Sequence, residues 1–294
     1  MKYLLILPGV LVLLVLIAVV RTLVSPRKTS DYQPPQTDEA EALRLAGKLS
    51  KMIQVDTTSH AGGDDPARFR AFHKTLAELF PRVFSQLEKT EIDGNLLFYW
   101  KGRSREKPIL LMSHQDVVPA EGAWSHAPFS GDIADGKVWG RGASDTKCSV
   151  MAFFEAAEQL LAEGYTPPTD VYLASSCTEE WAGDGAPKLV AELQRRGVEL
   201  FLEKLRASGR DIRALHRARI AAIGPGTQAE LRKYGLLAEL IPQVFDGQHL
   251  GGALASRLRP GDRVWLPRAK QGGRELLEEL EKVPGAVVRE LPLY

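Results

Sequence analysis

The stretch Pro-Ile-Leu-Leu-Met-Ser-His-Gln-Asp, residues 108–116, is the part of the sequence that decides the fold. A short apolar run ends in polar residues, which is typical of a buried strand that stops at a functional edge. The pattern recurs in Val-Tyr-Leu-Ala-Ser-Ser-Cys-Thr-Glu-Glu, residues 171–180, after an amphipathic helix predicted over 148–163. Alternating strands and helices predict an α/β sheet with helices on both faces. Chemistry in such sheets gathers at the carboxyl ends of strands, where both polar clusters fall.

Further elements follow from hydrophobic periodicity. In the first half we predict another strand over 96–100 and helices over 38–54, 66–88 and 186–196. Strands and helices are also predicted to alternate in the second half of the chain. Its predicted strands are 218–223, 264–266 and 286–288, and its predicted helices are one that ends near Tyr234 and one over 273–282.

Composition excludes some classes of protein. The chain has 294 residues and a net charge of +1, so it is long enough for one large or two modest domains and lacks the basic excess of a nucleic-acid-binding protein. Cys148 and Cys177 are the two cysteines, which excludes a disulfide framework and a cysteine-rich zinc knuckle. We expect both to be small buried thiols.

The N-terminus departs from this soluble average. Residues 4–20 (LLILPGVLVLLVLIAVV) carry no charge and approach the length that spans a bilayer. We predict a single-pass membrane anchor over 1–24, followed by a Pro-containing linker over 25–40. A signal peptide that is cleaved, leaving a secreted protein, is the alternative. No small-x-small cleavage site follows the apolar run, which favours the anchor.

Five side chains at the predicted strand ends and loops suit metal chemistry: His114, Asp116, Asp145, Glu179 and Glu180. Imidazole and carboxylate groups are ligands of zinc and similar divalent ions. Of two adjacent glutamates, one can bind an ion while the other acts as general base. Each motif alone has an ordinary structural explanation, such as a turn or a solvated surface. Their combination at successive strand ends indicates a metal site.

The chain here resembles a known family. The segments LLMSHQDVVP (110–119), WSHAPFSGDIADGKVWGRGASDTK (124–147) and TEEWAGDGA (178–186) are similar to the co-catalytic zinc family of aminoacylases, carboxypeptidases and succinyl-diaminopimelate desuccinylases. The resemblance covers about 40–200. It is nearest to the secreted or vacuolar carboxypeptidase and N-acyl-amino-acid hydrolase branch.

The resemblance implies a role for each residue. His114 would bind zinc, Asp116 would orient this histidine, and Asp145 would bridge two zinc ions. Glu180 would bind the second ion, and Glu179 would be the general base that activates water. The implied reaction is hydrolysis of a peptide or N-acyl amino acid amide bond beside a free carboxylate.

Two departures from the family pattern matter. Cys148 stands where the family usually has glycine. More seriously, the family's further aspartate and histidine ligands and its dimerisation domain do not follow Leu200, and Asp211 lies in the wrong context. We therefore expect a truncated zinc-peptidase-like domain over 41–200 with incomplete metal sites and impaired activity.

Residues 201–294 resemble a different enzyme, uroporphyrinogen-III synthase. The similar segments are FLEKLRASGRDIRAL (201–215), ARIAAIGPGTQAELRKYGL (218–236), IPQVFDGQHLGGAL (241–254), DRVWLPRAKQGGRELLEEL (262–280) and VVRELPLY (287–294). The resemblance implies part of a metal-free α/β enzyme, without a cofactor, that cyclises hydroxymethylbilane.

The resemblance to the synthase implies that Thr227 contacts substrate and that Tyr294 assists loss of the hydroxyl group. The segment Gly224-Pro-Gly-Thr227 offers backbone N–H groups at a helix start, which suits a carboxylate, although a plain turn explains it too. Arg268 and Lys270 are candidates to steer this acidic substrate.

The sequence therefore predicts two partial α/β domains that join near 197–203. Three functions stay open. The first is a zinc hydrolase that acts on a small N-acyl amino acid or peptide. The second is a tetrapyrrole cyclase fragment, and the third is an inactive chimera. Exposed strand edges and poor solubility should follow because each half lacks part of its fold.

Overall fold

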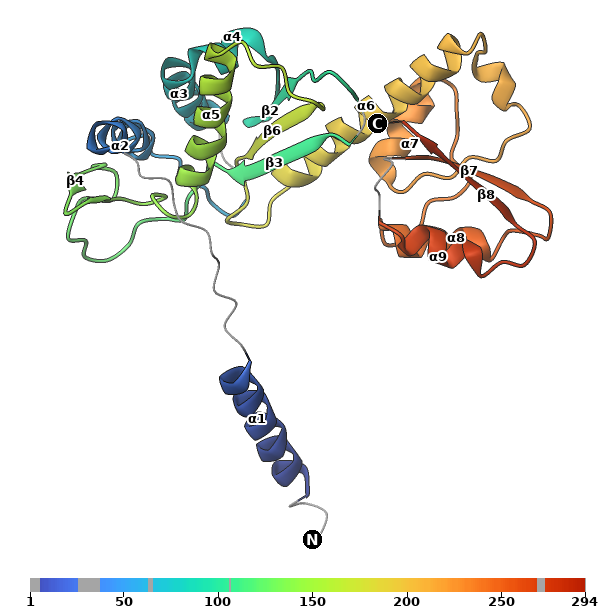
Figure 1. The fold of residues 1–294 in the computed structure, drawn as a ribbon, viewed down its shortest axis with the longest axis horizontal. Coiled ribbons are helices and arrows are strands. Elements are labelled where there is room, and N and C mark those ends of the chain that lie inside the picture. The colour runs from blue at the N-terminus through green and yellow to red at the C-terminus, as the bar shows by residue number, and fades with distance from the viewer. Residues whose placement is uncertain (1–5, 26–37, 63–65, 106, 269–272, 294) are drawn as a thin grey trace. The chain divides into compact units, whose positions relative to one another are not determined.

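The computed structural model describes residues 6–25, 38–62, 66–105, 107–268 and 273–293 (Figure 1). The chain divides into two compact units, Met1–Ala42 and Leu43–Tyr294. Helix α1 (Ile6–Val24) lies in the first unit, and α2 (Glu39–Ile53) begins there.

The membrane anchor predicted over residues 1–24 is not supported. Among the residues whose structure is described, no helix has both the length and the apolar character that crossing a bilayer requires. Most of the linker predicted over 25–40 lies outside the described residues, and its last two residues already belong to α2.

The second unit contains a four-stranded sheet in the order β1-β2-β6-β3. Strands β1 (Glu88–Ile92), β2 (Asn95–Trp100) and β6 (Val171–Ser176) pair antiparallel, and β3 (Ile109–His114) pairs parallel with β6. The predicted strands at 96–100, 108–112 and 171–175 are thereby confirmed. The carboxyl ends of β3 and β6 meet at one edge, because His114 lies opposite Ser176.

Helices cover both faces of this sheet, as the α/β prediction requires. Successive side chains of a strand point to opposite faces. Leu96 and Phe98 of β2 join a buried cluster that includes residues of α5 (Lys147–Ala162), whereas Leu97 packs with Leu189 of α6 (Gly185–Ala207). Figure 1 shows α5 and α6 on either side of the strands.

The helix predicted over 66–88 is two helices, α3 (Pro66–Leu79) and α4 (Pro81–Gln86). Proline lacks a backbone N–H and its ring clashes with the preceding turn, so Pro81 ends α3 and starts α4. Phe98 then packs edge-on against Phe154 with ring centroids 5.4 Å apart, and this contact joins the sheet to α5.

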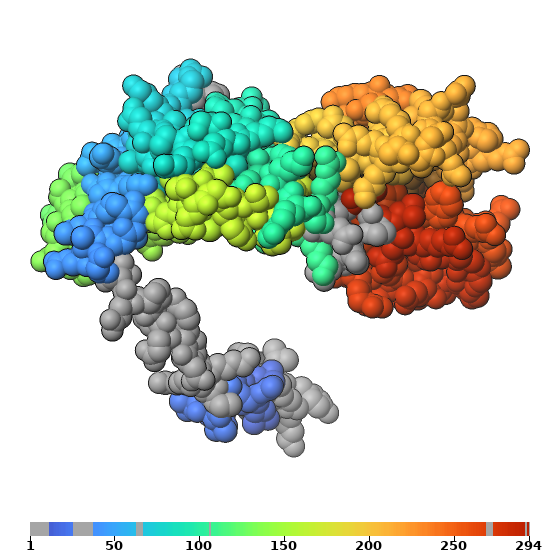
Figure 2. All heavy atoms as spheres, turned by 45° about the horizontal axis from the view of Figure 1, so that its top comes forward, coloured from blue at the N-terminus to red at the C-terminus, as the bar shows by residue number. Residues whose placement is uncertain are grey.

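The second half has a small parallel sheet of β7 (Arg263–Arg268) and β8 (Val287–Pro292) with α8 (Gly247–Ala255) and α9 (Glu275–Glu281) against it. The remaining elements are the hairpin β4 (Ile133–Ala134) and β5 (Lys137–Val138), a 3-10 turn (Ile212–Leu215) and α7 (Pro225–Lys233). In space-filling view the residues after 207, orange to red, form one continuous mass (Figure 2).

The strand predicted over 218–223 is wrong. This segment makes one isolated bridge, between Ala221 and Leu240. Pro242 follows closely on the partner segment and has no N–H to extend the ladder, and Gly224 already caps α7. The pairing therefore stops after one step.

Helix α6 is longer than predicted. The expected helix over 186–196 extends to Ala207 and passes through the boundary expected between the two resemblances. Its early turns pack on β2 and β6, and its later turns bring Val198 and Leu202 against Ala222 and Leu231. The division into domains 41–200 and 201–294 stays a prediction.

Strand β3 is the last strand of its sheet within the described residues, and its outer edge is apolar. Ile109 donates its N–H to Asp170 of the β6 side, and Gln115 donates to Ser176. Residues with the alternate parity, Leu110 and Met112, therefore direct their N–H and C=O groups away from β6. Their side chains are 44% and 49% exposed, so an uncovered apolar edge is present.

We expect Leu110→Lys to reduce self-association of the protein, because a charged side chain on an edge strand opposes pairing with another strand. Sedimentation velocity at several concentrations would measure the fraction of large species. Leu237→Lys is the matched control, since Leu237 is exposed but lies outside every strand. Equal effects of the two substitutions would contradict a specific role of the β3 edge.

Candidate metal centre

The structure brings the predicted metal-type residues together at the carboxyl ends of β3 and β6. His114 is the last residue of β3, and Glu179 and Glu180 follow the end of β6. Asp145 lies two residues before α5 begins. Three segments that are far apart in sequence thus meet, two of them because the parallel neighbours β3 and β6 end at the same sheet edge.

Three of these side chains could share one ion. His114, Asp145 and Glu180 each offer a ligand atom, and these atoms lie within 4.8 Å of one another. Nε2 of His114 is 3.1 Å from Oδ1 of Asp145 and 3.6 Å from Oε2 of Glu179. The ring is buried, whereas the carboxylate of Asp145 is 81% exposed, so the group opens to solvent on one side.

Asp116 lies next to His114 on the buried side of this group and is itself fully buried. Its carboxylate accepts hydrogen bonds from the backbone N–H groups of Glu179 (3.2 Å) and Glu180 (3.1 Å) and from Oγ of Ser59 (2.8 Å). Burial alone would raise the pKa of Asp116, but the bonds from His114, Glu180 and Ser59 hold it below its ordinary value. The carboxylate therefore stays ionised.

The carboxylate of Asp116 also controls the protonation of His114. Burial lowers its pKa, but the hydrogen bond and charge of Asp116 outweigh this and raise the pKa to about 9. Nδ1 lies 3.0 Å from the backbone oxygen of Asp116 and 3.4 Å from Oδ1. Because Nδ1 donates toward Asp116, Nε2 is the nitrogen left for a metal ion. The orienting role that the resemblance implied for Asp116 stays a prediction.

The pKa of Glu180 is raised above its ordinary value. Burial raises its pKa, His114 lowers it, and the neighbouring carboxylates of Asp145 and Asp116 raise it again. A cluster of like charges of this kind is relieved when a cation binds among them. The electrostatics therefore favour a cation at the group.

The donor set fits one divalent ion. One imidazole and two carboxylates with an open side match the pattern of a catalytic zinc site, which keeps a position for water or substrate. Across the part of the chain that is described, no second group of three such donors occurs. The two-ion arrangement implied by the resemblance is thus matched for one ion only. Asp211 is elsewhere, where it caps a 3-10 turn and pairs with Arg213 at 2.6 Å.

Sequence reasoning missed two buried supports of the site, Ser59 and Lys147. Ser59 binds Asp116, and its carbonyl accepts the indole N–H of Trp181 at 2.7 Å. Lys147 is fully buried, which lowers its pKa to about 7. Nothing in the pattern around Ser59 marked it. For Lys147 a signal was available, because it directly follows the Gly-Arg-Gly-Ala-Ser-Asp-Thr segment that contains Asp145.

Of the residues that the resemblance to the synthase singled out, the structure describes Thr227 and Arg268. Thr227 lies in the first turn of α7, and Tyr294 and Lys270 lie outside the described residues. Arg268 ends β7, donates to the carbonyl of Gly273 and lies 3.5 Å from a carboxylate oxygen of Glu290.

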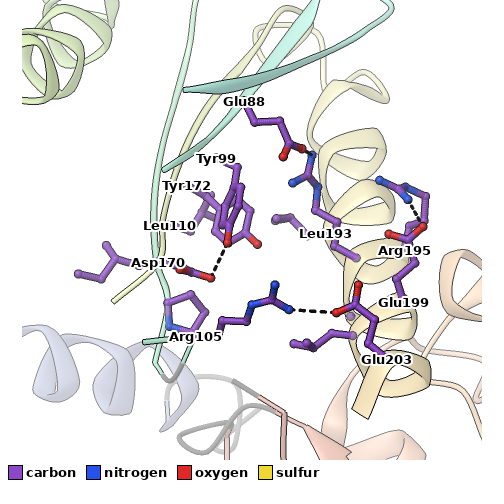
Figure 3. A pocket seen from close by; sticks show the side chains of 15 residues that line it. Glu88, Tyr99, Arg105, Leu110, Asp170, Tyr172, Leu193, Arg195, Glu199 and Glu203 are labelled. Atoms are coloured by element: carbon purple, nitrogen blue, oxygen red, sulfur yellow. Dashed lines mark hydrogen bonds and ion pairs between the residues drawn. The ribbon is translucent and has the colours of Figure 1, made fainter. Parts of the chain in front are cut away.

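A cavity of about 360 Å³ lies apart from the metal centre, between the sheet and α6 (Figure 3). None of the predicted site residues lines it. Its polar groups have partners within the protein: Arg105 pairs with Glu203 at 3.1 Å, and Tyr99 donates a hydrogen bond to Asp170 at 3.0 Å. Burial and Asp170 raise the pKa of Tyr99 to about 12. This satisfied network is a structural contact between the sheet and α6.

Several curated proteins are similar to a little over half of the chain. A probable carboxypeptidase S-like 2 of Dictyostelium discoideum is 37% identical over 187 residues, 60% of this chain and 36% of that protein. An N-fatty-acyl-amino acid synthase/hydrolase of Danio rerio is 37% identical over 58% of this chain and 34% of its own length. Carboxypeptidase S of Saccharomyces cerevisiae is 36% identical over 51% of this chain and 29% of its own length.

The chain thus spans about a third of the length of these curated relatives. Two family models match different segments. Residues 110–236 match Peptidase family M20/M25/M40, and residues 188–294 match Uroporphyrinogen-III synthase HemD. The two matches overlap over 188–236, which includes most of α6. The chain therefore carries a segment of the M20/M25/M40 peptidase type followed by a segment of the uroporphyrinogen-III synthase type.

Proposed function

We propose that the first segment binds one zinc ion and hydrolyses the amide bond of a peptide or an N-acyl amino acid. The observation that carries this proposal is the convergence of His114, Asp145 and Glu180 within 4.8 Å, with Glu179 beside them. The similarity to carboxypeptidases and N-fatty-acyl-amino acid hydrolases supports the substrate class.

Each residue has a chemical task in this reaction. A bound zinc ion would polarise the substrate carbonyl and make a water molecule more acidic. Glu179, whose side chain is 56% exposed and lies 3.6 Å from His114, takes the proton from water and passes it to the leaving nitrogen. Asp116 accepts hydrogen bonds from the backbone N–H groups of both glutamates. It therefore fixes the position of the base Glu179 relative to the proposed metal ligand Glu180.

The partial donor set limits the expected activity. The resemblance implies two ions and five or more protein ligands, whereas the described residues supply three ligand atoms for one ion. Fewer protein ligands mean weaker binding and a less constrained ion. We therefore propose a zinc site of reduced affinity and a slow hydrolase.

Replacing His114 by alanine should weaken zinc binding by at least about 100-fold, because it removes the one imidazole ligand of the group. Competition with a chromophoric chelator would measure the dissociation constant. His126→Ala is the matched control, since His126 also pairs with an aspartate, Asp132 at 2.9 Å, but is not one of the three ligands. Wild-type protein that binds zinc no better than His114→Ala would exclude the metal function and favour an inactive chain.

Zinc binding should release about one proton per ion at pH 7.5, because His114, with its pKa of about 9, is protonated before zinc displaces the proton from Nε2. The release should be smaller by about one proton above pH 10, where His114 is already neutral. Calorimetric titrations in two buffers with different ionisation enthalpies measure the number of protons. Release that does not change between pH 7.5 and 10 would contradict this assignment.

A second candidate function belongs to the other segment. The match of residues 188–294 to uroporphyrinogen-III synthase favours cyclisation of hydroxymethylbilane, a substrate rich in carboxylates. Thr227 stands in the first turn of α7, where backbone N–H groups at the helix start suit such a group. This candidate is weaker than the zinc hydrolase, because no second described residue joins Thr227 in a site.

If the synthase activity exists, Thr227→Ala should lower the rate of uroporphyrinogen III formation by about tenfold or more, the loss expected for a charge-assisted hydrogen bond to substrate. Chromatography of the oxidised products would separate the isomers. Thr75→Ala on α3 is the control, because Thr75 lies in the other segment. Product at the level of the uncatalysed reaction in wild-type protein would reject the candidate.

A further inference from the structure

Lys147 stands at a structurally unusual position beside the metal centre. It is the first residue of α5, two residues after Asp145, and its side chain is fully buried. Its ammonium group donates hydrogen bonds to the backbone carbonyls of Met52 (3.1 Å) and Val55 (2.7 Å). Burying an ammonium group is costly, so a lysine kept there has a specific task.

Met52 lies in the last turn of α2 and Val55 lies two residues after it, where the chain leads into the segment that contacts the end of β3. Thr57 donates its Oγ–H to the carbonyl of Gln115 at 2.6 Å. Its own carbonyl accepts the N–H of Val117, and Ser59 donates its N–H back to the carbonyl of Val117 at 3.0 Å. Thr57 and Ser59 therefore bind both neighbours of Asp116, Gln115 and Val117, and Gln115 is also the residue that follows His114.

These contacts form a closed path from Asp145 to His114. The path runs from Asp145 along two peptide units to Lys147, through the ammonium group to Met52 and Val55, and through residues 57–59 to the strand end. We propose that Lys147 is a positioning residue, which sets the location of the Asp145 segment relative to His114 before a metal ion binds. This inference rests on the proposed zinc function.

The segment needs such a support because Asp145 has little packing of its own. Its side chain is 81% exposed and contacts Nε2 of His114, the atom a metal ion would take, so the backbone contributes much to where its carboxylate lies. Lys147 shapes that backbone in two ways. Its N–H donates to the carbonyl of Gly142 at 3.0 Å. Its methylene stem also lies under Gly142, where a Cβ atom would come within 3.3 Å of Cδ.

A purely structural role predicts a different result from a positioning role. Lys48 offers the comparison, because it also donates to a carbonyl, that of Leu79 at 3.1 Å, and pairs with the buried Glu155. Lys48 connects α2 to α5 at Glu155, which lies eight residues after Lys147, whereas Lys147 itself begins the helix next to the Asp145 segment. Removing either ammonium group costs stability, whereas only Lys147 should affect the metal ligands.

The experiment compares Lys147→Met, Lys147→Arg and Lys48→Met in the full chain. We expect Lys147→Met to weaken zinc binding by about 10–100-fold, the range seen when a group that orients a metal ligand is removed. It should also change the visible absorption of the protein with Co²⁺ in place of zinc, which reports on ligand geometry. Lys147→Arg should recover part of the affinity, and Lys48→Met should lower Tm but leave the affinity unchanged.

Unchanged zinc affinity in Lys147→Met, or a loss equal to that in Lys48→Met, overturns the inference. Hydrogen exchange provides a readout that needs no metal. In metal-free Lys147→Met, amides of 143–146 and 57–59 should exchange faster together, and in Lys48→Met they should not. If Lys147→Met does not fold, the same comparison is made with Lys147→Arg, and independent exchange of the two segments overturns the inference.

Zinc binding by the wild-type protein distinguishes failure of the proposed zinc function from failure of the proposed role of Lys147. If wild-type protein binds no zinc, the proposed function fails, and the exchange comparison alone decides the role of Lys147. If wild-type protein binds zinc but Lys147→Met matches it in affinity and in cobalt spectrum, the zinc function stands and the role of Lys147 is rejected.

Discussion

The buried carboxylate of Asp116 is the interaction on which the site depends. It receives hydrogen bonds from Ser59 and from the backbone of Glu179 and Glu180, and it faces the ring of His114. An ionised group without water is stable only when such donors surround it. Two strand ends and a loop must therefore converge on it. The same charge that orders these segments also sets the protonation of the histidine.

The sheet was predictable where continuous apolar runs mark the strands, as in β2, β3 and β6, although Ile109 to Met112 of β3 are exposed and not buried as the sequence predicted. Strand β1 (Glu88–Ile92) was not, because it lies at an edge, its residues are mostly exposed and charged, and no alternating pattern marks it. The break at Pro81 was readable from the sequence in principle, but the periodicity of 66–88 outweighed it. The strand expected over 218–223 failed for a tertiary reason: its partner around Leu240 offers one bridge.

The ligand-type residues were predictable for a related reason. Acidic and imidazole groups that follow apolar strands stand out, and parallel neighbours bring strand ends together. Ser59 carries no such signal, because a serine is ordinary on any surface and acquires its role only when the fold buries it. Lys147 stands next to the Asp145 segment in the sequence, but the sequence does not show that its side chain is buried. Their hydrogen bonds link segments separated by dozens of residues. That information is absent from local pattern.

Helix α6 has a consequence for how the chain acquires its structure during synthesis. The helix is 23 residues long, and the region matched by both family models lies along it. The sheet face that carries Leu97 and Ala174 stays open until the first turns of α6 leave the ribosome. Its last turns are then themselves uncovered until Ala222 and Leu231 arrive. During synthesis, the apolar surface of each part of the chain is therefore covered only after the next part has emerged. The folding of the first segment thus depends on the second, although their sequences resemble unrelated enzymes.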